Sequence, residues 1–104
     1  MKQPLQIQFR GMEPSPALES AARDKAAKLD QFAANLMSCR VVIEQEQKHQ
    51  QQGRPFAVNI DLTMPGQELR VDRVRHEDAY VALRDAFEAM TRRLEDTVRR
   101  ARPF

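Results

Sequence analysis

Arginine and lysine side chains are the residues of this 104-residue chain whose types and spacing best support a chemical role. The chain carries 17 basic and 15 acidic residues, so its net charge is only +2, but this charge is unevenly placed. Residues 89–104 have a net charge of +3, whereas the other 88 residues sum to −1. Because a guanidinium holds phosphate oxygens bidentately and stacks on bases, the cluster is typical of a phosphate-binding surface. It is equally typical of a solvated helix end, where cations complement the helix dipole.

Two predicted helices carry the candidate binding residues. The charge pattern alone is equally consistent with a nucleic-acid-binding surface and with a solvated helix face. The candidate RNA-binding residues are Arg23, Lys25, Lys28, Arg84, Arg92, Arg93, Arg99 and Arg100. If the helices pack side by side, their outward surfaces adjoin and these side chains form a basic ridge. The second helix, at residues 78–101, would span about 36 Å, which is long enough to cross several phosphates. Two pairs spaced four apart, Asp24 with Lys28 and Glu88 with Arg92, are expected to be surface ion pairs.

Catalytic and metal-binding constellations are not apparent in the sequence. The two histidines, His49 and His76, have no metal-ligand spacing and do not neighbour Cys39. The three glycines stand alone at expected turns, so no phosphate-binding glycine motif is present. We therefore predict no catalytic residue, no metal site and no cofactor, and we do not expect an enzyme. Cys39 is expected to be a buried strand thiol, and His76 to be exposed or hydrogen-bonded at a helix end.

The elements that must position these cations follow from hydrophobic periodicity. Apolar residues alternate with polar ones at residues 5–9, 39–43, 56–64 and 69–71, which predicts four strands. Ser15 is a predicted N-cap followed by Pro16, and an apolar stripe continues to Leu36. A second stripe runs from Tyr80 to Val98. Residues 47–55 are expected to be a polar connection, and residues 65–66 a hairpin turn.

The predicted fold class is α+β, with the order β-α-β-β-β-α in a single domain over residues 1–104. Each strand has one apolar face and each helix one apolar stripe. Two helices on one face of a four-stranded sheet would bury all of these surfaces, and the other sheet face would stay polar. Val42 places one apolar group on that other face, and Val74 is expected to mark a frayed strand end or a bulge.

Three short segments on the predicted helices resemble those of a known family. They are KAAKLDQF at residues 25–32, DAYVAL at residues 78–83, and RRL at residues 92–94. With the predicted element order, they resemble the ribosome hibernation-promoting factor and ribosome-associated inhibitor family, also described as sigma-54 modulation proteins, over about residues 5–102. The family's fold resembles that of double-stranded RNA-binding domains. Because the sequence ends at Phe104, we expect the short form of the family, without the C-terminal dimerisation domain of the long form.

The resemblance implies a translation inhibitor that binds the small ribosomal subunit and its ribosomal RNA near the path of messenger and transfer RNA. Such factors act under stress or in stationary phase, in the cytoplasm. Lys25, Lys28 and Arg92 match the family's basic positions, and the other candidate cations are supported by charge. We expect no membrane and no small-molecule substrate, and we favour a monomer over a dimer.

The chain also departs from the family pattern. Glu95 and Asp96 follow the RRL segment where lysines are common, and Gln31 and Ala89 also occupy positions that are often basic. These departures predict weaker affinity for phosphates and a flatter salt dependence. They leave open an alternative, in which the chain is a divergent paralogue that acts as a protein-interaction module without ribosome binding. An edge strand would be the surface through which such a module could dimerise.

Overall fold

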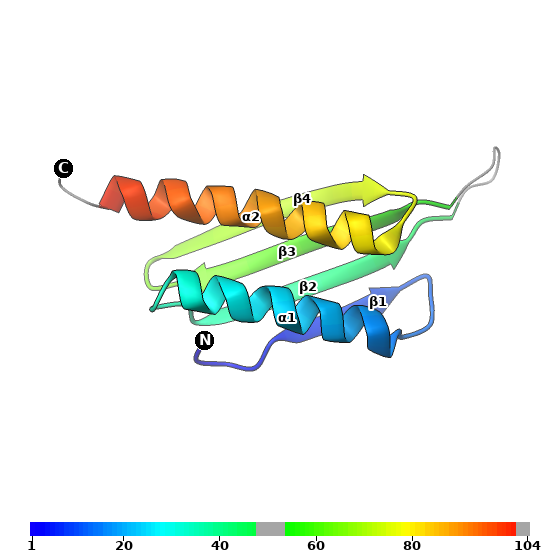
Figure 1. Cartoon of the computed structure of the whole chain (residues 1–104), viewed down its shortest axis with the longest axis horizontal. Coiled ribbons are helices and arrows are strands. Elements are labelled where there is room, and N and C mark those ends of the chain that lie inside the picture. Colours follow the sequence, from blue (N-terminus) through cyan, green and yellow to red (C-terminus); the bar gives the residue numbers. More distant parts are fainter. Residues whose placement is uncertain (48–53, 102–104) are drawn as a thin grey trace.

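A computed structural model describes residues 1–47 and 54–101, and it shows four strands and two helices (Figure 1). In chain order they are β1 (Gln6–Arg10), α1 (Pro16–Phe32), β2 (Ser38–Gln45), β3 (Phe56–Met64), β4 (Gln67–His76) and α2 (Ala79–Ala101). The predicted order β-α-β-β-β-α is therefore confirmed. Most of the connection expected at residues 47–55, His49 included, lies outside the described residues.

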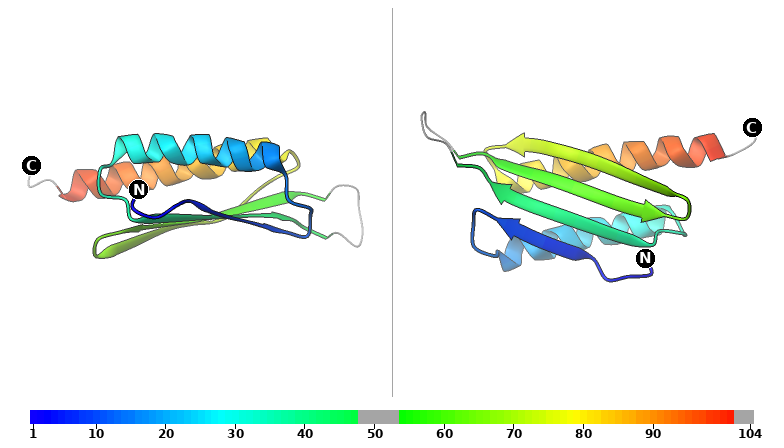
Figure 2. Two further views of the ribbon diagram at one scale, coloured as in Figure 1. Left: turned by 90° about the horizontal axis from the view of Figure 1, so that it is seen from below. Right: turned by 180° about the vertical axis from the view of Figure 1, so that it is seen from behind.

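The strands form one mixed sheet in the order β1-β2-β3-β4. β1 runs parallel to β2, with Ile7 opposite Val41, and the other neighbours are antiparallel. A parallel pair needs a crossover connection, and α1 provides it. Both helices cover the same face of the sheet, and the opposite face carries no helix (Figure 2). The predicted fold class is thus confirmed.

Local hydrogen bonds explain where the helices begin. The N–H of Leu18 donates to Ser15 Oγ over 3.2 Å, and Pro16 occupies the first turn, as the sequence predicts. At the start of α2, Asp78 Oδ1 accepts a hydrogen bond from the N–H of Tyr80 over 2.8 Å. His76 Nδ1 in turn accepts one from the N–H of Asp78 over 2.9 Å. The helix-end hydrogen bonding expected of His76 is therefore observed.

The hydrophobic core lies between the sheet and the two helices. The helices contribute a stripe of small and large side chains, including Ala22, Leu29, Leu83 and Met90. The strands contribute the alternating residues of the sequence pattern, such as Val41, Ile43, Ile60 and Leu62. Cys39 belongs to this core at 1% exposure, as predicted. Both stripes also include buried alanines, whose small side chains allow a close approach of helix and sheet.

The edge strand β4 contains a bulge. Val58 pairs with Val74 and Ile60 pairs with Val71, so two residues of β4 oppose Asn59 alone. One of them, Arg73, has a φ of 54°, a left-handed conformation that is uncommon for a residue with a side chain. Its N–H donates to Asn59 Oδ1 over 2.5 Å, which stabilises the distortion. Of the two expectations for Val74, the bulge is correct, and β4 continues to His76.

The structure corrects three details of the predicted burial. Phe32 and Tyr80 belong to the apolar stripes by spacing, yet they are 46% and 49% exposed. Each lies at the end of its helix, next to a buried residue of the core, Ala33 or Ala79. The face without helices is not uniformly polar either, because Val42 and Ala57 are both buried there.

Candidate nucleic-acid interface

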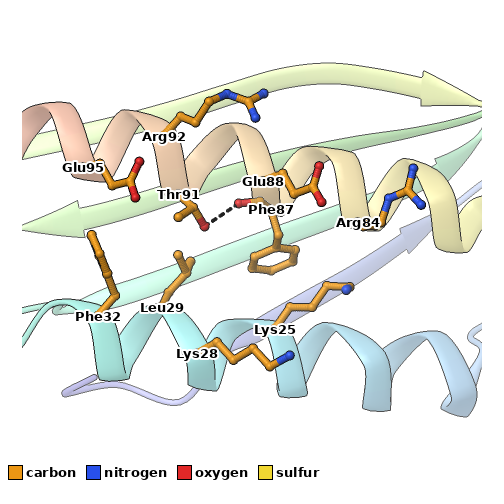
Figure 3. A pocket seen from close by; sticks show the side chains of 10 residues that line it. All are labelled: Lys25, Lys28, Leu29, Phe32, Arg84, Phe87, Glu88, Thr91, Arg92 and Glu95. Atoms are coloured by element: carbon orange, nitrogen blue, oxygen red, sulfur yellow. Dashed lines mark hydrogen bonds between the residues drawn. The ribbon is translucent and has the colours of Figure 1, made fainter.

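The two helices lie side by side and run in the same direction (Figure 1). Between their outward sides is an open hollow of about 530 Å³, which we call the inter-helix groove. Figure 3 shows the ten side chains that line it. They are Lys25, Lys28, Leu29, Phe32, Arg84, Phe87, Glu88, Thr91, Arg92 and Glu95.

Helical spacing places these side chains together. Lys25 and Lys28 are three residues apart on α1, so they share one side of that helix. On α2, the lining residues follow one another at alternating steps of three and one over residues 84–95, which spans about three turns. Leu29 and Phe87 are buried where the helices meet, so the helices are held together beneath the charged groups. Thr91 Oγ1 donates to the Phe87 carbonyl oxygen over 2.8 Å.

The groove is electropositive on balance, with four cations against two carboxylates. Arg84 forms an ion pair with Asp85 over 3.0 Å. Within residues 1–47 and 54–101, Lys25, Lys28 and Arg92 form no ion pair. The predicted ion pairs between Asp24 and Lys28 and between Glu88 and Arg92 are therefore not formed, and that prediction is wrong. Three cations of the groove are left available for an external anion.

The other four predicted residues lie elsewhere. Arg23 pairs with Glu19 over 2.8 Å and lines a hollow beside Met1 and Leu5, away from the groove. Arg93 and Arg100 lie on the opposite side of α2, beside Leu69 of β4.

Arg99 lies at the end of the groove. It pairs with Asp96 over 3.3 Å and lines a small hollow with Phe32, Glu95 and Val98. The eight candidates therefore do not form one ridge: four line the groove, one adjoins its end, and three lie apart.

Residues that the sequence analysis did not assign to the site are also present in it. Glu88, Thr91 and Glu95 share the groove side of α2 with Arg84 and Arg92. Their spacing of three or four residues was the available signal. The spacing of Phe32 places it on the apolar stripe and therefore predicts a core residue. In the structure it is exposed and lines the groove.

Other potentially reactive groups lie away from the groove. Burial raises the pKa of the Cys39 thiol to about 12, and the nearby charge of Asp61 adds to the increase. Such a thiol is not a nucleophile at neutral pH. In the part of the chain that the structure describes, no three His, Cys, Asp or Glu side chains are grouped to hold a metal ion. Nor is any described helix long and apolar enough to cross a membrane.

Comparison with solved structures reveals the same fold. A ribosomal subunit interface protein from Coxiella burnetii superposes with a TM-score of 0.76 at 14% identity, over 89% of this chain and 94% of that one. The N-terminal domain of Protein Y from Thermus thermophilus gives a TM-score of 0.70 at 26% identity, over 93% of this chain and 96% of that domain. No curated protein matches the chain.

A family model supports the resemblance found in the sequence. The model described as sigma 54 modulation protein / S30EA ribosomal protein matches residues 5–102. This range contains every strand of the structure and both helices, which are the elements that line the groove. The chain therefore belongs to the sigma 54 modulation protein / S30EA ribosomal protein family.

Proposed function

We propose that this chain is a ribosome-associated translation inhibitor. In this role it binds the ribosomal RNA of the small subunit near the path of messenger and transfer RNA, in the cytoplasm, during stress or stationary phase. Family membership supports an association with the ribosome. The observation that carries the RNA-binding proposal is the inter-helix groove, which is lined by cations from both helices. Three of these cations form no ion pair within the described residues.

Binding by this groove needs no catalytic step. Lysine and arginine side chains replace the counterions of RNA phosphates, and the release of those ions drives association. The buried contact around Leu29 and Phe87 fixes the spacing of the two helices, so the cations are positioned before RNA arrives. α2 has 23 residues, which corresponds to about 34 Å of helix. A bound domain of this size would exclude messenger and transfer RNA from the space that it fills.

The edge strands give little support to the alternative of a dimerising interaction module. β4 exposes Arg70, Asp72 and Arg73, and its bulge interrupts the regular backbone ladder. Charged side chains and bulges are devices that protect an edge from pairing with another chain. At the other edge, β1 has only five residues. These features favour a monomer.

Sedimentation of a stationary-phase lysate through a sucrose gradient tests the proposal. We expect the chain to migrate with small subunits or whole ribosomes at low salt, and to move toward the top of the gradient as salt increases. Addition of the purified chain to a cell-free translation reaction should lower protein synthesis. If the chain stays at the top of the gradient even at low salt, the proposed function is wrong.

A further inference from the structure

Phe32 is the most exposed phenylalanine for which the structure describes a side-chain environment. It is 46% exposed, whereas Phe87 is buried, and Phe9 and Phe56 are partly buried against the core. An exposed aromatic side chain has an unfavourable contact with water that a bound partner can remove. Its position in the fold indicates which partner.

The end of α1 explains why the ring is not in the core. α1 ends at Phe32, and the next residue, Ala33, has an extended backbone with φ −136°. The chain then turns inward, so Ala33 and Leu36 fill the core below the helix end. Phe32 remains on the outer side, pointing toward α2 in Figure 3.

The ring of Phe32 lines two hollows, and each of them contains a cationic side chain together with Glu95. It lines the inter-helix groove, where Lys28 is one turn earlier on the same helix. It also lines the smaller hollow of about 210 Å³ that contains Arg99. An exposed aromatic ring in a surface that also carries cations is the combination by which proteins hold single-stranded nucleic acid, because bases stack on the ring while cations contact the phosphates.

We propose that Phe32 is a stacking platform for an unpaired nucleobase of the RNA that occupies the inter-helix groove. This inference rests on the proposed function. It adds a contact with a nucleobase to the contacts that the cations make with the RNA phosphates. The base covers the exposed face of the ring, and the adjoining phosphates lie toward Lys28 on one side and Arg99 on the other. Stacking of this kind accepts any base, since each has a π-face.

Two substitutions of Phe32 test the role of the ring. Phe32→Leu keeps an apolar side chain but removes the aromatic face, and Phe32→Tyr keeps that face. We expect Phe32→Leu to weaken binding to purified small ribosomal subunits by about 5- to 50-fold, and Phe32→Tyr to bind within about 2-fold of the unchanged chain. Stacking releases no counterions, so Phe32→Leu should leave the slope of log Kd against log salt unchanged. Thermal melting verifies that both variants are folded.

Protein-free small-subunit ribosomal RNA provides the second measurement. The same loss for Phe32→Leu on this RNA would assign the contact to a nucleobase. A loss on subunits that disappears on the free RNA would assign it to a ribosomal protein and overturn the inference. The inference would also be overturned if Phe32→Leu bound as tightly as the unchanged chain. The same holds if Phe32→Tyr weakened binding as much as Phe32→Leu. Failure of the unchanged chain to bind subunits would instead contradict the proposed function.

Discussion

Lys28 on α1 and Arg92 on α2 line the same groove, and neither forms an ion pair with a described residue. Strands β2, β3 and β4 lie between the two helices in the sequence. The fold brings the helices together because both pack on one face of the sheet. If the proposed function is correct, both cations contact phosphates of the bound RNA. Their individual contributions can be measured.

Neutralising either cation should change how binding depends on salt. We expect Lys28→Gln and Arg92→Gln each to reduce the slope of log Kd against log salt by about 1, because each removes about one phosphate contact. At about 0.1 M salt, each change should weaken binding to small subunits by roughly 3- to 10-fold. Arg40→Gln is the control, since Arg40 is exposed on the sheet face without helices. An equal effect of Arg40→Gln would show that the groove is not the contact surface.

The carboxylates in the groove should oppose RNA binding. Glu88 and Glu95 are exposed beside the cations and repel phosphate at the same site. We expect Glu88→Gln and Glu95→Gln each to tighten binding by roughly 2- to 5-fold at low salt, with the gain disappearing as salt screens the charges. Glu68→Gln on β4 removes the same charge away from the groove and should have little effect. Weaker binding of either groove variant would mean that its carboxylate contacts RNA directly.

A buried carboxylate that directly follows β2 contacts the edge strand β4. Glu46 is 9% exposed, and its carboxylate accepts hydrogen bonds from Arg73 and, over 2.7 Å, from Arg75. We expect Glu46→Ala to lower the free energy of unfolding by about 1–2 kcal/mol, because the loss of charged hydrogen bonds is partly offset by hydration of the two half-exposed arginines. Urea unfolding measures the change. Glu44→Ala, two residues earlier and without an ion pair among the described residues, should cost less than about 0.5 kcal/mol.

The buried thiol predicts a loss of stability at alkaline pH. The pKa of Cys39 is about 12 in the folded chain, against a usual value of 9.0. The unfolded chain therefore loses this proton first, and stability that is complete below pH 9.0 decreases until the folded thiol also ionises near pH 12.

The comparison with Cys39→Ala isolates this effect from other groups that titrate in the same range. Between pH 8 and pH 10, the free energy of unfolding of the unchanged chain should fall by about 1.4 kcal/mol more than that of Cys39→Ala. Urea unfolding at the two pH values measures the difference. An identical fall for both chains would contradict the burial of the thiol.

Much of the fold could be predicted from the sequence because its local signals agree with one another. β3 alternates without interruption over nine residues, and the Ser15 cap with Pro16 fixes the start of α1. The bulge in β4 was only one of two expectations, since spacing alone does not show which backbone groups remain paired. The exposure of Phe32 and Tyr80 could not be predicted, because spacing places a residue near the apolar stripe but does not show whether another element covers it.

The site could be predicted only in part. Side-chain type and helical spacing identify the cations, and the spacing of Lys25 with Lys28 or Arg84 with Arg92 places each pair on one side of a helix. Which sides face each other depends on how the helices are rotated on the sheet. That rotation is set by core residues such as Leu29 and Phe87, and it separates Arg23 and Arg93 from the groove.

The most direct test of the account is the binding of two matched charge reversals to purified small ribosomal subunits at about 0.1 M salt. Lys28→Glu with Arg92→Glu changes the groove, and Arg10→Glu with Arg40→Glu changes the net charge equally on the sheet face without helices. Measured by co-pelleting, the groove pair should lose binding and the sheet pair should bind within a few-fold of the unchanged chain. Retained binding of the groove pair, or an equal loss for the sheet pair, would contradict the claim that the inter-helix groove holds the chain on the ribosome.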